Sequence, residues 1–119
     1  MKNFRDLLVW QKAHSLTLEI YEASASFPDN ERFGLTSQLR RSAASTPANL
    51  AEGCGRGSDA DLKRFLYIAM GSASETEYHL LLAYDLGFLG EQTHKRLTQD
   101  TQEVKRMLSA FIAKLGADS

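Results

Sequence analysis

A row of hydrogen-bonding and charged side chains recurs every three or four residues in the second quarter of the chain. Its members are Gln38, Arg41, Ser45, Asn49, Glu52 and Arg56. On a helix these six positions fall within an arc of about 80°. Such groups can hydrogen-bond one another or a partner subunit, and arginine is also the preferred bidentate ligand of phosphate. The row therefore predicts a polar network or an anion-binding surface, and both readings stay open here.

Other charged residues extend these two readings. Arg40 lies outside the arc, nearer the apolar flank, and we expect it to reach Glu75 or Glu77 on the following helix. A second basic group lies near the end of the chain. Together with arginines of the row, it gives a set of possible nucleic-acid contacts: Arg41, Arg56, Lys95, Arg96, Lys105 and Arg106.

Short motifs that suggest catalysis are incomplete. Glu91 and His94 have the Glu-x-x-His spacing of di-iron bundles, but such a site needs two of these motifs. The glycine-rich run at 53–58 follows a helix and lacks the Lys-Ser/Thr ending of a phosphate-binding P-loop. No Ser/His/Asp or Cys/His set assembles from the three scattered histidines and Cys54. We therefore expect no enzyme activity, no metal and no cofactor.

Four segments with helical periodicity must position these groups. Their apolar residues recur at three and four, and they cover about residues 4–26, 30–54, 58–86 and 91–115. Pro47 lies inside the second segment, whose pattern continues in phase on both sides, so we expect a kink there. Short connections predict an all-α, antiparallel up-down-up-down four-helix bundle. We expect residues 1–119 to form a single domain of this kind.

Composition narrows the class of protein. The 119 residues are 43% apolar and 24% charged, which is typical of a globular domain. Uncharged stretches such as 65–74 are far shorter than the roughly 20 residues of a membrane span. The first six residues show no secretory signal, and the lone Cys54 excludes an intrachain disulfide. We expect a cytoplasmic protein without a membrane partner.

The charge pattern favours pairing between helices. A net charge of −1 excludes general attraction to nucleic acid. Residues 31–57 nevertheless carry four Arg against two Glu, whereas residues 58–90 carry two basic residues against five acidic ones. Opposite charges on consecutive helices favour ion pairs within or between subunits and leave room for a local basic patch.

The third helical segment is apolar on two faces. One face suffices for a bundle core. The second face holds Phe65, Ile68, Leu82 and Leu86. We expect this second face to pack against another copy of the chain, because large exposed apolar patches usually mark interfaces. The alternative is a single wide core stripe.

Several runs of residues match the pattern of a known family. They are LVWQKA at 8–13, FP at 27–28, ERFGLTSQLRR at 31–41 and PANLAEG at 47–53, followed by Arg56, the run at 65–72 and Glu75-x-Glu77. These runs resemble the 23S rRNA intervening-sequence protein family over nearly the whole chain. The chain is also similar to the accessory variability determinant proteins of diversity-generating retroelements. Those proteins are basic pentameric bundles that bind nucleic acid and a reverse transcriptase.

The resemblance implies a ring-like homo-oligomer, a pentamer, without an established biochemical activity. By position, the family's polar signature corresponds to Gln38, Arg40, Arg41, Ser45, Asn49, Glu52, Arg56, Glu75 and Glu77. We interpret it as a network that fixes the second helix against the third helix and the neighbouring subunit. The leading hypothesis is a non-enzymatic, homo-oligomeric interaction or scaffold protein. The alternative is an RNA/DNA-binding accessory protein whose partner is a nucleic acid or a nucleic-acid enzyme.

Overall fold

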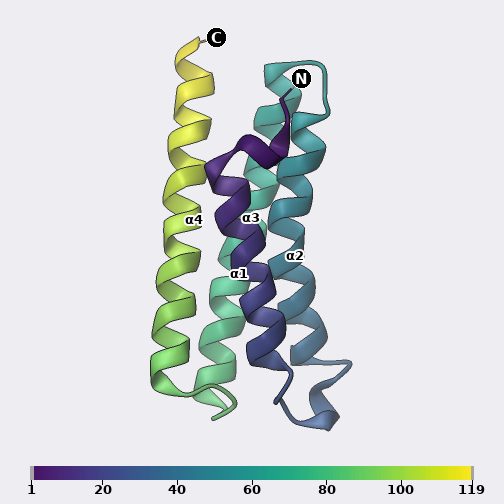
Figure 1. Ribbon diagram of the computed structural model, residues 1–119, viewed down its shortest axis with the longest axis vertical. Helices are drawn as coiled ribbons and strands as arrows, with labels where there is room; N and C mark the ends of the chain where they lie inside the picture. The colour runs from purple at the N-terminus through teal and green to yellow at the C-terminus, as the bar shows by residue number, and fades with distance from the viewer. Residues whose placement is uncertain (1, 119) are drawn as a thin grey trace.

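The computed structural model describes residues 2–118, which contain helices and no strand. The four long helices are α1 (Leu8–Ser24), α2 (Leu35–Cys54), α3 (Asp59–Asp85) and α4 (Glu91–Asp118), and two short 3₁₀ helices are η1 (Phe4–Asp6) and η2 (Asp29–Glu31). In Figure 1 the chain runs down along α1, up along α2, down along α3 and up along α4. The predicted all-α four-helix bundle is thus confirmed. Met1 and Ser119, which the expected domain includes, lie outside the described residues.

The first two helices begin later than the sequence pattern predicts. Leu7 is extended, with φ −78° and ψ 125°, and separates η1 from α1. Residues 29–31 form a 3₁₀ turn, and α2 begins at Leu35 instead of residue 30. The Glu31 carboxylate accepts a hydrogen bond from the Leu35 amide at 3.1 Å. Glu31 thereby satisfies one of the free amides of the first turn of α2, which explains where that helix starts.

The last two helices lie close to their predicted bounds. Ser58 precedes α3, and its hydroxyl accepts a hydrogen bond from the Asp61 amide at 3.1 Å, as an N-cap does. Gly87 follows α3 with φ +82°, a left-handed conformation in which glycine avoids the strain of a side chain. The fourth helix continues three residues beyond the predicted end at residue 115.

Pro47 lies inside α2, which continues through it as one helix. Proline has no amide hydrogen, so the carbonyl of Ala43, four residues earlier, loses its helical donor. The hydroxyl oxygen of Thr17 lies 3.0 Å from this carbonyl oxygen and 2.8 Å from that of Ala13. Its single hydrogen can therefore donate to the acceptor that Pro47 leaves open.

The core lies between all four helices. Each helix packs against its neighbours in sequence and α1 packs against α4, whereas α1 and α3 are diagonal to each other. The largest fully buried apolar side chains are Ile20, Leu39, Leu50, Leu66, Leu80, Leu97, Leu108 and Val104. No helix among residues 2–118 combines the length and apolar character needed to span a membrane.

Candidate functional site

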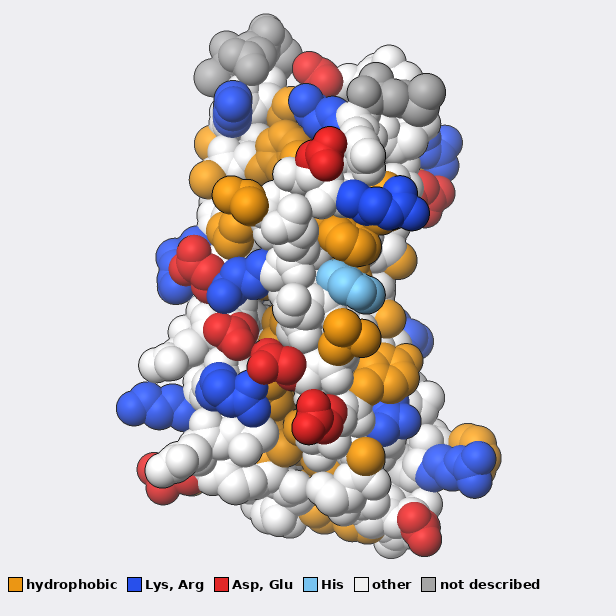
Figure 2. Space-filling view, viewed as in Figure 1, with side chains coloured by type: hydrophobic (Ala, Val, Ile, Leu, Met, Phe, Trp, Pro, Cys, Tyr) orange, Lys and Arg blue, Asp and Glu red, His pale blue; other side chains and the backbone are white. Residues whose placement is uncertain are grey.

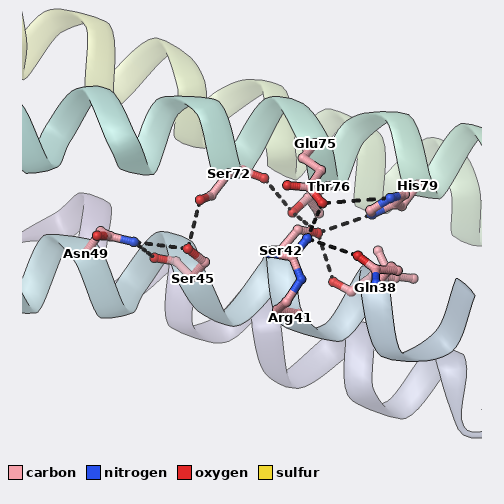
Figure 3. Close-up of polar contacts among 10 residues, drawn as sticks. Gln38, Arg41, Ser42, Ser45, Asn49, Ser72, Glu75, Thr76 and His79 are labelled. Carbon is pink, nitrogen blue, oxygen red and sulfur yellow. Dashed lines mark hydrogen bonds and ion pairs between the residues drawn. The ribbon is translucent and has the colours of Figure 1, made fainter. Parts of the chain in front are cut away.

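Polar side chains of α2 and α3 meet along the line where the two helices pack (Figure 3). We call this cluster the α2–α3 seam: it comprises Gln38, Arg41, Ser42, Ser45, Asn49, Ser72, Glu75, Thr76 and His79. The hydroxyl oxygens of Ser45 and Ser72 are 2.8 Å apart, and Asn49 Nδ2 donates to Ser45 Oγ at 3.0 Å. The seam therefore joins the two helices through side-chain hydrogen bonds as well as apolar contacts.

An ion pair closes one end of the seam. The Arg41 guanidinium donates to the Glu75 carboxylate and, at 3.0 Å, to Gln38 Oε1. His79 lies beside this pair, with Nε2 3.9 Å from a Glu75 carboxylate oxygen and Nδ1 3.4 Å from Ser42 Oγ. Burial lowers the pKa of His79, the Glu75 carboxylate acts against this shift, and the Arg41 charge adds to it.

Ser42, His79 and Glu75 have the residue types of a hydrolytic triad, which the scattered sequence positions did not suggest. The geometry gives them a different role. Ser42 is 0% exposed, and its hydroxyl lies 3.1 Å from the carbonyl oxygen of Leu39 and 3.0 Å from Thr76 Oγ1. A substrate cannot reach a nucleophile enclosed in this way. We therefore interpret the three residues as part of the packing between α2 and α3.

The seam contains residues that the sequence interpretation missed. Four of its members, Ser42, Ser72, Thr76 and His79, were absent from the predicted network. A signal for three of them was present, because positions 72, 76 and 79 follow one another at intervals of four and three, the spacing of one helix face. The same intervals place polar residues on the facing side of α2.

Arg40 points toward α1 and away from α3. Its Nε donates to Ser24 Oγ at 2.8 Å, its Nη2 donates to the Tyr21 carbonyl at 3.1 Å, and its guanidinium lies over the Tyr21 ring. The expectation that Arg40 reaches Glu75 or Glu77 is therefore wrong. The reason is geometric: Arg40 and Arg41 are consecutive, so their side chains leave the helix about 100° apart.

The remaining acidic members of the predicted network have other partners. Glu77 faces α4 and accepts hydrogen bonds from Gln102 Nε2 and Lys105 Nζ, both at 3.0 Å. These two hydrogen bonds lower the pKa of Glu77, while its partial burial opposes the shift. Glu52, in the last turn of α2, pairs at 3.0 Å with Arg56, which lies just beyond the end of that helix. The predicted set is thus divided into four groups: the seam, the contacts of Arg40 with α1, those of Glu77 with α4, and the Glu52–Arg56 pair.

Most of the proposed nucleic-acid contacts already lie beside a carboxylate. Five of the six are paired: Arg41 with Glu75, Arg56 with Glu52, Arg96 with Glu19, Lys105 with Glu77 and Arg106 with Glu103. The sixth, Lys95, is exposed. Basic and acidic side chains are accordingly intermingled on the face seen in Figure 2 and do not gather into one basic patch there.

The motif of Glu91 and His94 has a structural explanation. The His94 ring stacks on the ring of Tyr84, with centroids 4.4 Å apart and planes 7° from parallel. This contact fastens the beginning of α4 to the end of α3. No group of three or more His, Cys, Asp or Glu suited to a metal occurs among residues 2–118.

The second apolar face of α3 is present, but its composition differs from the prediction. Ile68 and Leu86 are exposed, at 42% and 51%. Phe65, however, is only 6% exposed, and Leu82 is half-buried against the core, so assigning these two to an outer face was wrong. The large exposed side chains at the centre of this face are Tyr67, Ile68, Tyr78 and Leu81, which we call the α3 stripe.

Gly53 explains the burial of Phe65. A Cβ atom at Gly53 would lie 2.9 Å from Phe65 Cβ, so the glycine allows α3 to approach α2 closely. The guanidinium groups of Arg56 and Arg64 then lie over the Phe65 ring, 4.9 and 4.7 Å from its centre. This contact depends on two helices, and the helical wheel of α3 alone does not contain it.

The surface that holds the α3 stripe carries no exposed charged side chain between positions 65 and 84. All exposed residues between positions 65 and 84 are uncharged, namely Tyr67, Ile68, Gly71, Ser74, Tyr78, Leu81 and Tyr84. The two acidic residues in this range, Glu75 and Glu77, are half-buried and paired with Arg41 and Lys105. A patch of aromatic and aliphatic side chains without charges has the composition of the centre of a protein–protein interface.

Fold and site together define a helical-bundle protein with an exposed apolar surface. The chain belongs to the 23S rRNA-intervening sequence protein family, whose profile matches residues 5–110. It is also similar to a crystal structure described as a protein with unknown function from the S23 ribosomal protein family of Bacteroides thetaiotaomicron VPI-5482. The two chains are 27% identical with a TM-score of 0.80, and the match covers 88% of this chain and 98% of that one. No curated protein matches the chain. The similarity to retroelement accessory proteins stays a prediction.

Proposed function

We propose that this chain is a non-enzymatic interaction protein that works as a homo-oligomer, with the α3 stripe buried between copies. The observation that carries the proposal is the stripe itself: Tyr67, Ile68, Tyr78 and Leu81 are between 42% and 58% exposed in the single chain. Burying apolar surface is worth roughly 25 cal/mol per Å². Aromatic side chains of this kind are enriched among the residues that dominate binding energies.

A ring-like assembly, with five copies as the expected number, is part of this proposal because the family resemblance implies it. The α2–α3 seam supports the proposal in a second way. Its hydrogen bonds and ion pair hold α3 against α2, so α3 offers its stripe as a preorganised surface. Rigid surfaces bind more tightly because less freedom is lost on association. A cytoplasmic location belongs to the same proposal and is consistent with Cys54, the lone buried thiol.

The oligomeric state tests this proposal directly. Light scattering coupled to size-exclusion chromatography at micromolar concentration is expected to give a defined mass that is a multiple of 13.3 kDa. Tyr78→Glu places a charge in the stripe and is expected to lower that mass. Gln99→Glu, at an exposed position of α4, adds the same charge elsewhere and is expected to leave the mass unchanged. A wild-type monomer would disprove the proposal.

A further inference from the structure

A second apolar stripe lies on α1. Leu8, Leu18 and Tyr21 are 70%, 58% and 44% exposed, and we call these three residues the α1 stripe. The charged residues Lys12 and Glu19 turn away from it toward α4, where they pair with Asp100 and Arg96. The exposed positions between Leu8 and Leu18 are Gln11, His14 and Ser15, and the exposed Glu22 follows Tyr21 at the end of the stripe.

The two stripes lie on different sides of the molecule. The helices α1 and α3 are diagonal to each other in the bundle, and in Figure 1 α1 lies in front of α3. The stripes therefore cannot cover each other within one chain. Each copy offers two unlike surfaces, which is the requirement for a head-to-tail contact between copies.

The stripes match in spacing. Leu8, Leu18 and Tyr21 follow one another at intervals of ten and three residues, as Ile68, Tyr78 and Leu81 do. Both helices run in the same direction along the bundle (Figure 1). Large side chains on one stripe thus recur with the same period, and in the same order, as those on the other.

The stripes also lie at the same height along the bundle. Thr17 contacts Ala43, and the adjacent Ser42 contacts Thr76, so Thr17 of α1 and Thr76 of α3 are level to within about one helical turn. Leu18 follows Thr17 by one residue and Tyr78 follows Thr76 by two. Leu8 with Ile68, and Tyr21 with Leu81, have the same offset as Leu18 with Tyr78, because the intervals within the two stripes are equal.

We propose that the α1 stripe of one copy packs against the α3 stripe of the next copy, around a closed ring. This inference rests on the proposed function and names the surface that covers the α3 stripe. Because the two stripes are level, copies follow one another by rotation with little shift along the bundle. A head-to-tail contact without such a shift closes into a ring, whereas a shifted contact continues into a fibre.

Two single variants and their mixture test the pairing. Leu18→Glu damages only the α1 stripe, and Tyr78→Glu damages only the α3 stripe. Each variant alone is expected to be monomeric by light scattering, since no ring can close. Mixed in equal amounts, they retain one intact pair of surfaces and are expected to form a dimer of twice 13.3 kDa. The Gln99→Glu protein, taken through the same procedure, should assemble as the wild type does.

Each other result has a definite meaning. If Leu18→Glu assembles like the wild type, or if the mixture stays monomeric, the pairing of unlike stripes is wrong even though the chain oligomerises. A monomeric wild type would instead contradict the proposed function, on which the pairing rests. Circular dichroism verifies that each variant is folded. Leu8→Glu and Leu81→Glu give an independent pair of variants for the same mixing experiment.

Discussion

The hydroxyl oxygen of Thr17 lies 3.0 Å from the carbonyl oxygen of Ala43, the acceptor that Pro47 leaves without a helical donor. Thr17 is buried, and so are Ala43 and Pro47, so water cannot take over this role. A buried acceptor without a donor is costly, and the contact between α1 and α2 removes that cost.

Removing this hydroxyl is therefore expected to destabilise the fold. Thr17→Val keeps the shape of the side chain and leaves the Ala43 carbonyl unsatisfied, which should cost about 1–3 kcal/mol of unfolding free energy. Urea denaturation followed by circular dichroism measures the change, with Thr17→Ser as the control that keeps the donor. Pro47→Ala restores a backbone donor to the Ala43 carbonyl. Thr17→Val should therefore cost less unfolding free energy in the Pro47→Ala background than in the wild type. Equal losses in the two backgrounds would argue against this role of Thr17.

The close approach of α2 and α3 makes Gly53 sensitive to substitution. Gly53→Ala would place Cβ 2.9 Å from Phe65 Cβ and 3.1 Å from Leu62 Cδ1. The resulting overpacking is expected to cost about 1–3 kcal/mol, despite the higher helix propensity of alanine. Gly57→Ala is the matched control, because no heavy atom lies within 4 Å of a Cβ at that position. Thermal unfolding compares the two, and an unchanged melting temperature for Gly53→Ala would show that α3 can move aside.

His79 is expected to make stability depend on pH. Its pKa in the folded chain is below the ordinary value of 6.5, so the unfolded chain binds a proton more readily. Stability is therefore present above pH 6.5 and is lost as the pH falls from there toward the folded pKa. Urea denaturation at pH 7.5 and 5.5 should show a larger loss for the wild type than for His79→Gln. The lowered pKa of Glu77 acts below its ordinary value of 4.5, outside this range. A loss of the same size in both proteins would assign the pH dependence to other groups.

Nucleic-acid binding by helices α2 and α4 is the alternative hypothesis from the sequence, and the ion pairs lead to a specific expectation. Arg41 and Arg56 are already paired, so fluorescence anisotropy with a labelled RNA should show only weak, salt-sensitive binding. Replacing their partners, in Glu52→Gln/Glu75→Gln, frees both guanidiniums and should raise the affinity severalfold at low salt. Arg41→Gln/Arg56→Gln is the control and should lower it. Tight wild-type binding that persists at high salt would favour the alternative function.

The sequence was sufficient for the number of long helices and for the bounds of the last two, because apolar spacing and caps are local. Ser58 as an N-cap and the stop at residues 87–90 could be read from a few adjacent residues. Contacts between helices could not be predicted from adjacent residues. Phe65 is buried because Gly53 on another helix admits it, and Arg40 turns to α1 because Ser24 and the Tyr21 carbonyl lie there.

The candidate site followed the same division. Gln38, Arg41, Ser45, Asn49 and Glu75 were predicted from one helical row and a family resemblance, and they do lie in the α2–α3 seam. Tyr67, Tyr78 and Leu81 were missed because exposure depends on which side of α3 the other helices cover. An apolar pattern alone does not distinguish a covered face from an open one.

The order in which the helices pack has a consequence for synthesis on the ribosome. The pairs α1–α2, α2–α3 and α3–α4 join neighbours in sequence, so each can form as soon as its second member is made. Contact between α1 and α4 spans nearly the whole chain and forms last. The nascent chain therefore leaves one flank of its core open until α4 has left the exit tunnel, and truncation within α4 should expose that flank.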